Sequence, residues 1–367
     1  MPDRRIAFAI ILLAGFEWTL NVLKKLFGKK PLRRVRLAGT EHEFEVGRNE
    51  TVLESALKAG LAYPHDCTVG TCGTCRSRLV AGKVDAITPF GYTLSRAELE
   101  GGYILACQAV PESDLEIEVD LAGSAATKTA ARLVATKDLT HDIKRVIWQC
   151  DAPVHYRAGQ YMNVTWPGAP GPRSYSFSAA PDEAGQTRVS TFIRKVPGGA
   201  FTERLFGEDL TGLEFEIEAP HGGFWLRDGD GPILLIAGGS GLSPLISLLE
   251  DAVARGVKRD ALLLFGGRAE RDLYCLDQID EISRRWPSRF EFRPVLSEEP
   301  TPGRRSGMVT DEVPAAVEWL GGNAQLQGYL CGPPGMIDAG VSALVAAGVG
   351  LAEIHYDKFT DASSRSA

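Results

Sequence analysis

The N-terminal stretch is the most apolar part of the chain. Residues 6–16 carry only apolar side chains or glycine, and the pattern continues to Leu23 with Glu17, Thr19 and Asn21 as interruptions. About 18 helical residues rise about 27 Å, close to the roughly 30 Å of a hydrocarbon core. The pattern predicts a hydrophobic helix that spans a membrane, lies in its interface through residues 6–27, or packs against the protein itself.

Basic residues at the end of this segment orient it. Residues 24–30 include four lysines, whereas Arg4 and Arg5 precede the apolar run. Positive charge is retained on the cytoplasmic side, which predicts that the bulk of the chain lies on the cytoplasmic side of a bacterial-type inner membrane. No A-x-A-like cleavage site follows the run, which disfavours a signal peptide. Residues 1–31 are therefore an anchor candidate with a basic linker.

The next segment, residues 32–122, has the short periodicities of a strand-rich domain. Residues 37–46 predict a hairpin, and residues 114–121 alternate acidic and apolar side chains as in a half-exposed strand. Between them, residues 51–59 predict a helix, because Thr51 and Glu54 have the spacing of a capping box. Residues 123–131, rich in Ala, Gly and Thr, predict a linker.

The remaining chain divides into two further patterns. Residues 132–227 carry strand runs punctuated by Pro and Gly without a long helical period, which predicts a β-barrel or sandwich. Residues 228–367 alternate apolar strands with helical patterns, the layout of an α/β nucleotide-binding domain. The expected elements are strands at residues 233–237, 261–265 and 328–330 and a helix at residues 245–254.

Composition narrows the functional classes. The 367 residues carry a net charge of −7, which argues against a general nucleic-acid-binding protein. Seven cysteines are present, and three of them fall within nine positions. This pattern favours a metal site in a reducing compartment over a secreted disulfide framework.

The clustered cysteines have a specific spacing. Cys67, Cys72 and Cys75 form C-x4-C-x2-C, and Cys107 follows later in the chain. This is the plant-type arrangement for a [2Fe–2S] cluster, in which one tight loop supplies three thiolates. Small residues fill the loop, and glycines within it can adopt positive φ and turn N–H groups toward the sulfurs. Tetrahedral zinc is the alternative, but it commonly uses two C-x2-C pairs, and Cys107 has no close partner.

Two further motifs predict nucleotide cofactors. Residues 173–176 read Arg-Ser-Tyr-Ser on an expected strand, and a Gly-Gly turn at residues 198–199 opens an expected helix. Such residues can hold a pyrophosphate and stack on a flavin ring, although a plain surface strand is the alternative. Residues 238–241 (Gly-Gly-Ser-Gly) follow a buried strand and open a helix, as dinucleotide-binding turns do, without the G-x-G-x-x-G spacing.

A second strand end supports the dinucleotide site. Residues 331–334 (Cys-Gly-Pro-Pro) follow another apolar strand, where α/β folds bind ligands, although an inert buried thiol is the alternative for Cys331. The choice between NADH and NADPH stays open at this point. Arg268 and Arg271 could meet a 2′-phosphate, and no carboxylate at the strand end decides the matter.

Together these motifs resemble the ferredoxin–NAD(P)H reductase superfamily in its form fused to an N-terminal plant-type ferredoxin. Within it, the chain is most similar to oxygenase reductases of the xylene monooxygenase type. The most specific stretches are residues 64–75, 173–178, 271–277 and 329–334. The resemblance implies a β-grasp [2Fe–2S] ferredoxin domain, an FAD-binding β-barrel and an α/β NAD-binding domain.

The resemblance also implies roles for individual residues. Ser176, Cys331 and Asp357 would surround the reacting atoms of flavin and nicotinamide, and Phe359 would cover the flavin. Superfamily members often carry Glu where this chain has Asp357, and the hydrophobic N-terminus is not part of the pattern. The implied FAD contacts are Arg173, Ser174, Tyr175, Ser176, Gly199 and Thr202; the implied NADH contacts are Gly238, Gly239, Ser240, Gly241, Arg268, Cys331, Gly332 and Pro333.

The implied function is electron transfer from NADH through FAD and the cluster to a terminal oxygenase or hydroxylase, with a membrane-bound diiron enzyme as the leading hypothesis. The electron-entry subunit of a respiratory NADH:quinone reductase is the alternative, but those proteins use a C-x5-C interval. A third hypothesis is a scaffold protein with a vestigial reductase fold, but the intact cofactor motifs disfavour it. The acidic residues between 112 and 120 predict either a docking strand for a basic partner face or a solvated sheet edge.

Overall fold

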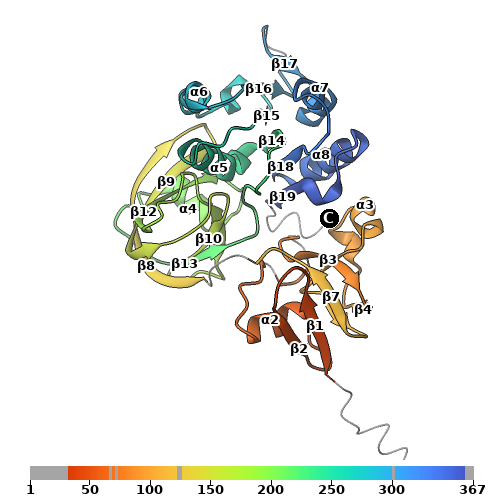
Figure 1. Ribbon diagram of the computed structural model, residues 1–367. Coiled ribbons are helices and arrows are strands. Elements are labelled where there is room, and N and C mark those ends of the chain that lie inside the picture. The colour runs from red at the N-terminus through yellow and green to blue at the C-terminus, as the bar shows by residue number, and fades with distance from the viewer. Residues whose placement is uncertain (1–31, 66–67, 71–72, 122–125, 300–301, 360–367) are drawn as a thin grey trace, which may run out of the picture.

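The computed structural model describes residues 32–65, 68–70, 73–121, 126–299 and 302–359 (Figure 1). They form a β-grasp domain, an antiparallel barrel and an α/β domain in chain order, as the sequence predicts. The N-terminal helix expected within residues 1–31 lies outside the described residues. Within those ranges, no helix is both long and apolar enough to cross a membrane.

The β-grasp domain is built on a mixed sheet in the order β2-β1-β7-β3-β5, in which β1 and β7 are parallel. The predicted capping box is present, because Thr51 and Glu54 each accept a hydrogen bond from the other's backbone N–H at the start of α2. The expected hairpin is confirmed, but its first strand starts at Arg33. The elements are β1 (Arg33–Leu37), β2 (Glu43–Val46), α2 (Val52–Lys58), β3 (Arg76–Ala81), β4 (Val84–Ala86), η1 (Phe90–Tyr92), α3 (Arg96–Glu100), β5 (Tyr103–Leu105), β6 (Ala109–Pro111) and β7 (Leu115–Glu118).

The barrel has the antiparallel order β11-β10-β13-β8-β9-β12. A bridge between Phe177 and Thr191 joins the end of β11 to β12 and closes the sheet on itself. The first residues of β8 pair with β13, so Thr127–Ala131 belong to the barrel and not to the linker expected over 123–131. The elements are β8 (Thr127–Asp138), β9 (Ile143–Val154), β10 (Tyr161–Thr165), β11 (Arg173–Ser176), β12 (Gln186–Arg194), α4 (Thr202–Gly207) and β13 (Glu214–His221).

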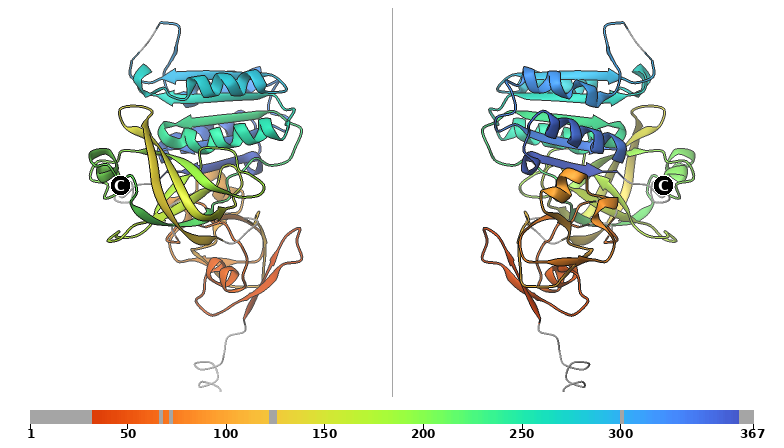
Figure 2. Two further views of the ribbon diagram at one scale, coloured as in Figure 1. Left: turned by 90° about the vertical axis from the view of Figure 1, so that its left-hand side faces the viewer. Right: turned by 90° about the vertical axis from the view of Figure 1, so that its right-hand side faces the viewer.

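The α/β domain contains a parallel sheet in the order β17-β16-β15-β14-β18-β19. Successive residues of β14 and β15 are buried on opposite faces, against α5 and α6 on one side and α7 and α8 on the other (Figure 2). Strand order reverses between β14 and β18, which creates a ligand-binding crevice at their carboxyl ends. The elements are β14 (Ile233–Gly238), η2 (Gly239–Gly241), α5 (Leu242–Ala254), β15 (Ala261–Gly267), η3 (Glu270–Asp272), α6 (Leu276–Arg285), β16 (Phe290–Leu296), β17 (Arg305–Ser306), η4 (Val309–Glu312), α7 (Val313–Trp319), β18 (Gln327–Gly332), α8 (Pro334–Ala346), η5 (Leu351–Glu353) and β19 (Ile354–Lys358).

The domains pack closely on one another. The barrel shares a hydrophobic core with the α/β domain, because Ile143, Phe192 and Phe224 pack in the cluster that contains α5. The β-grasp domain contacts both neighbours, and β19 faces it directly in Figure 1. The carboxyl ends of β14 and β18 therefore lie near both the barrel and the β-grasp domain.

Candidate functional site

Two of the predicted metal ligands converge in the β-grasp domain. Cys75 directly precedes β3 and Cys107 follows β5, both are buried, and their Sγ atoms are 3.3 Å apart. A disulfide would hold them at about 2.05 Å, so the pair fits two ligands that face one metal centre. Cys67 and Cys72 lie outside the described residues. Gly70 and Gly73 have φ of +82° and +79°, as predicted for the loop.

Polar groups support this cluster loop. The Gln108 side-chain amide donates to the carbonyl of Cys107 at 3.0 Å and approaches its Sγ at 3.8 Å. A Cβ on Gly70 would lie 2.7 Å from the Gln108 side chain, so the loop and this amide fit each other closely. The Thr93 hydroxyl donates to the carbonyl of Gly70. Donors near cluster sulfurs tune the reduction potential.

The predicted flavin strand lies at one end of the barrel sheet. Arg173, on β11, is partly exposed, and its guanidinium donates to the carbonyl of Pro172 at 2.9 Å. The Tyr175 ring packs 5.8 Å from that of Phe201, and burial raises its pKa. Ser176 is buried, and its carbonyl accepts a hydrogen bond from the Ser243 hydroxyl of α5 at 2.9 Å. Ser174 is exposed and donates to Asn163 at 2.8 Å.

The polar groups of the turn before α4 form hydrogen bonds within the turn, which the sequence does not predict. The Thr202 hydroxyl bonds both the N–H and the carbonyl of Val196, each at 3.1 Å. The N–H of Gly198 donates to Glu203, and that of Gly199 donates to Val196. These two amides, which we expected to face phosphate, are therefore already hydrogen bonded, and Thr202 shapes the turn.

The two predicted glycine motifs meet at the carboxyl ends of β14 and β18. A Cβ on Gly241 would lie 2.1 Å from the carbonyl oxygen of Cys331, and one on Gly238 would lie 2.6 Å from the Met336 sulfur. Position 241 therefore needs glycine, because the backbone of β18 approaches it this closely, whereas a side chain at position 238 would require Met336 to move. The structure brings Gly238, Gly239, Ser240 and Gly241 together with Cys331, Gly332 and Pro333.

Three of the four residues implied near the reacting atoms, Cys331, Asp357 and Phe359, occupy adjoining positions. Cys331 lies opposite Asp357 in the register of β18 and β19, and the N–H of Phe359 donates to the carbonyl of Gly332 at 2.9 Å. Ser176 lies on the barrel side, where its carbonyl accepts a hydrogen bond from Ser243 in the first turn of α5. Burial, followed by the charge of Asp357, raises the pKa of the Cys331 thiol well above its usual value. Cys331 is therefore a buried, protonated thiol at neutral pH.

A cleft of about 250 Å³ extends from the glycine motifs along the carboxyl ends of the strands. Arg268 lines it but is held by Asp272, whose Oδ2 lies 3.0 Å from the guanidinium Nε. Asp142, from the turn between β8 and β9, lies 3.6 Å from Arg268 and 3.1 Å from Arg194. The sequence indicated no carboxylate at this strand end, but in the structure the carboxylates of Asp272 and Asp142 both line the cleft.

Comparisons with known proteins place these domains in a family. Family models match the chain as a 2Fe-2S iron-sulfur cluster binding domain over residues 35–112, an oxidoreductase FAD-binding domain over 130–225 and an oxidoreductase NAD-binding domain over 235–341. The xylene/toluene monooxygenase electron transfer component of Pseudomonas putida is 42% identical over 341 residues, which cover 91% of this chain and 95% of that protein. The reductase subunit of an aromatic O-demethylase from Amycolatopsis sp. is 37% identical, with 90% and 99% covered.

A solved structure agrees with these relatives. The crystal structure of an Amycolatopsis cytochrome P450 reductase superposes with a TM-score of 0.68 and 36% identity, covering 90% of this chain and 99% of that one. The chain belongs to the ferredoxin-fused oxygenase reductases. Its activity is electron transfer from NADH, through FAD and a [2Fe–2S] cluster, to an oxygenase. The family model decides for the iron–sulfur cluster over zinc.

Three acidic side chains of the segment between residues 112 and 120 are paired with arginines of the reductase itself. Arg36 and Arg227 lie 2.6 and 2.7 Å from Glu116 and Asp120, and Arg78 is paired with Glu118. The backbone N–H of Arg34 donates to Asp114 at 3.0 Å. Because arginines of the reductase itself pair with Glu116, Glu118 and Asp120, the arrangement favours the solvated sheet edge over a docking strand.

Proposed function

We propose that this reductase supplies a membrane-bound diiron hydroxylase with electrons. The observation that carries the proposal is the 42% identity to a xylene/toluene monooxygenase electron transfer component over almost the whole chain. The apolar segment at residues 6–27 supports a partner at a membrane surface. A plant-type cluster has a potential near −400 mV, low enough to reduce such an enzyme.

We assign FAD binding and NADH binding to two separate sets of site residues. Arg173, Tyr175 and Ser176 hold FAD on the barrel, and residues 238–241 and 331–333 hold NADH at the switch point. When bound there, FAD would supply the conversion between a two-electron hydride donor and a one-electron acceptor. The residues around it would orient the two rings, and the Cys331 thiol beside them is buried and stays protonated.

Other parts of the chain support these positions. The Ser243 hydroxyl fixes the carbonyl of Ser176 at the barrel edge, which ties β11 to the first turn of α5. Phe359 is tied to Gly332 through its backbone N–H, which would let its ring cover the flavin. The described residues of this site thus act by position, and the electron path needs no acid or base among them.

The cleft favours NADH over NADPH. Asp272 and Asp142 neutralise the guanidinium of Arg268, so a 2′-phosphate would meet two carboxylates and a cation that is already paired. Burial is the largest influence and raises the pKa of Asp272, but the hydrogen bonds and the charge of Arg268 together outweigh it and hold that pKa below its usual value. The carboxylate is therefore ionised at neutral pH, where it disfavours a phosphate.

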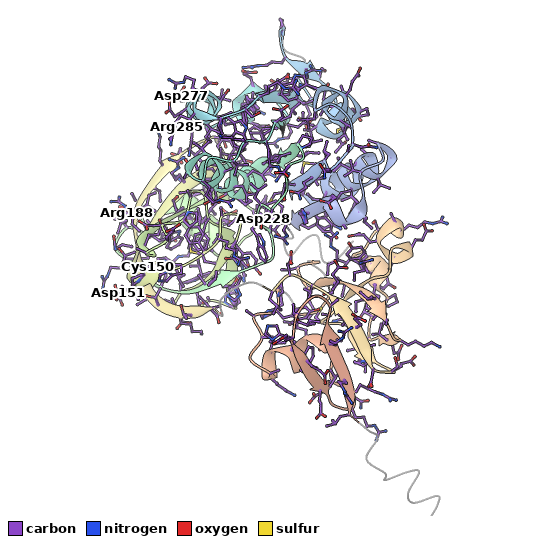
Figure 3. All side chains as sticks on the ribbon, viewed as in Figure 1. Cys150, Asp151, Arg188, Asp228, Asp277 and Arg285 are labelled. Atoms are coloured by element: carbon purple, nitrogen blue, oxygen red, sulfur yellow. The ribbon has the colours of Figure 1, made fainter. Side chains whose placement is uncertain are left out.

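The relay order is tested by replacing one cluster ligand. Cys107→Ser should abolish NADH-driven reduction of cytochrome c while much of the ferricyanide reduction remains, because ferricyanide takes electrons from the flavin. Cys150→Ser is the matched control, since Cys150 is buried in the barrel far from the β-grasp domain (Figure 3). Equal loss of both activities in Cys107→Ser would contradict the proposed order.

Membrane association is tested separately. A chain truncated before Leu32 should leave the membrane fraction of lysed cells and keep its ferricyanide reduction, whereas the full chain should sediment with membranes. If the full chain stays in the supernatant at low and high salt, the proposed role of residues 6–27 is wrong, and the electron relay is unaffected.

A further inference from the structure

A buried aromatic group joins the barrel to the β-grasp domain. Tyr161, the first residue of β10, lies opposite Ser176 of β11 on one side and His221 of β13 on the other. The rings of Tyr161 and His221 are stacked, with centroids 5.6 Å apart and planes 21° from parallel. Tyr161 is thus the immediate neighbour of the proposed flavin-binding strand.

The same side chains contact the loop that holds the cluster. The Tyr161 hydroxyl donates a hydrogen bond to the carbonyl of His65 at 3.0 Å. The His65 ring meets the His221 ring edge to face, with centroids 6.2 Å apart. His65 precedes Cys67 by two residues. Contacts therefore run from the neighbour of Ser176 to the entry of the cluster loop.

The surrounding backbone leaves little room for this contact to change. Gly222 has φ of +89°, and a Cβ there would lie 2.8 Å from the Tyr161 ring. A Cβ on Gly223 would lie 3.2 Å from Pro64, a residue of the β-grasp domain. The Gln160 side chain donates to the carbonyl of Gly222 at 3.0 Å and anchors the turn. Close packing of this kind transmits position between the two domains.

His221 is unusual within the bridge. Its Nε2 is buried and has no hydrogen-bond partner among the described residues, and Glu218 is 3.9 Å away. Buried polar atoms are normally paired, so this ring contributes to the bridge through its packing and not through a hydrogen bond from Nε2. Burial lowers the pKa of His221, which keeps the ring neutral where it stacks on Tyr161 and meets the His65 ring edge to face.

We propose that Tyr161, His221 and His65 form an aromatic bridge that holds the cluster loop against the flavin-binding strand and so sets the rate of electron transfer from FAD to the cluster. They are positioning residues for that step. The inference rests on the proposed placement of FAD beside Ser176, and it adds the route by which the two cofactor sites are held together.

The test separates cluster reduction from flavin reduction. Tyr161→Phe removes the hydroxyl that bonds His65 and keeps the ring. After anaerobic mixing with NADH, we expect cluster reduction to slow about fivefold, the change that loss of one ordinary hydrogen bond allows. FAD content, the spectrum of the dithionite-reduced cluster and ferricyanide reduction should stay at native values. Amide hydrogen exchange over residues 61–65 should become faster, a readout that does not depend on activity.

Further variants keep the bridge testable if the first disturbs the fold. His221→Phe keeps a stacked ring and should reduce the cluster at the native rate, whereas His221→Ala should slow it. Tyr156→Phe is the matched control, because that buried hydroxyl donates to Ala179 within the barrel and does not reach the β-grasp domain. Native cluster reduction together with native exchange in Tyr161→Phe and His221→Ala would overturn the proposal.

Failure of the underlying FAD placement would be recognised by a different result. Ser176→Ala should impair flavin reduction by NADH if Ser176 borders the flavin. If Ser176→Ala keeps native FAD content and native ferricyanide reduction, the placement is wrong, whatever the Tyr161 variants do.

Discussion

At the residue scale, the ion pair between Arg268 and Asp272 determines whether Arg268 can bind a 2′-phosphate. As a sequence position it could meet a 2′-phosphate, but its guanidinium is occupied by Asp272, which also accepts the backbone N–H of Arg268 at 2.9 Å. The pair is partly buried, and Asp142 adds a second negative charge at 3.6 Å. A cation held in this way offers less attraction to a phosphate, so coenzyme choice depends on the residues that pair with it.

Removing the charge of Asp272 should relax coenzyme selectivity. In Asp272→Asn the side chain keeps its shape, but Arg268 loses its main anion and can turn toward a 2′-phosphate. We expect the ratio of kcat/KM for NADPH to that for NADH to rise about tenfold, equivalent to about 1.4 kcal/mol. Steady-state ferricyanide reduction with each coenzyme measures it. Asp277→Asn is the control, because Asp277 is exposed on α6 (Figure 3); an unchanged ratio in Asp272→Asn would refute the assignment.

Site residues that share a short motif could be predicted, and residues brought together by the fold could not. The positive φ of Gly70 and Gly73 follows from the loop pattern, and the glycine turn after β14 follows from the apolar strand before it. Asp142 reaches the cleft from a barrel turn, far from the dinucleotide motifs in sequence. Local pattern carries no information about such a contact, because long-range packing alone sets it.

At the scale of elements, strand β19 connects the nucleotide site to the β-grasp domain. Arg76 of β3 donates to the carbonyl of Ile354 at 2.9 Å and lies over the ring of Tyr356 at 4.4 Å. Glu98 accepts hydrogen bonds from both Arg76 and the Tyr356 hydroxyl, each at 2.6 Å. Burial is the largest influence and raises the pKa of Glu98, but the charge of Arg76 and the hydrogen bonds from Tyr356 and Arg76 together outweigh it and lower that pKa. The sequences of β3, α3 and β19 taken separately do not predict this contact between β19 and the β-grasp domain.

Breaking this network should loosen the β-grasp domain. Glu98→Gln leaves a largely buried guanidinium without its carboxylate, a change that costs about 3 kcal/mol for buried pairs. Tyr356→Phe removes one hydrogen bond and should cost about 1 kcal/mol. Urea midpoints for loss of the cluster's visible absorbance measure both.

The matched control for this prediction is Glu100→Gln. Glu100 pairs with Arg96 on the exposed face of α3, where both side chains are mostly accessible. Such pairs contribute about 0–1 kcal/mol, so the midpoint should barely move. Equal midpoints for Glu98→Gln and Glu100→Gln would show that β19 does not hold the domain.

At the scale of the whole molecule, residues from all three domains together determine the protonation state of His355. His355 of β19 borders a cavity of about 180 Å³ that is also lined by Arg76 of the β-grasp domain and Arg227, which follows the barrel. Its Nε2 is buried without a hydrogen-bond partner among the described residues. Burial, then the charges of Arg227 and Arg76, lowers its pKa well below the usual value. Protonation of His355 is therefore incompatible with the packed arrangement.

The sign of this effect gives a pH dependence. Above about pH 6.5 the ring is neutral in both the folded and the unfolded chain, so it contributes nothing to the change with pH. Below that value the unfolded chain binds a proton that the folded chain does not, and stability falls by up to about 1.4 kcal/mol per pH unit for one such group. The melting temperature should therefore drop between pH 6.5 and 5, and His355→Gln should flatten that part of the curve. His42→Gln, at an exposed turn of the β-grasp domain, should leave the slope unchanged. Equal slopes for the native chain and His355→Gln would mean that the junction tolerates a charged ring, and that the buried arginines do not set its protonation.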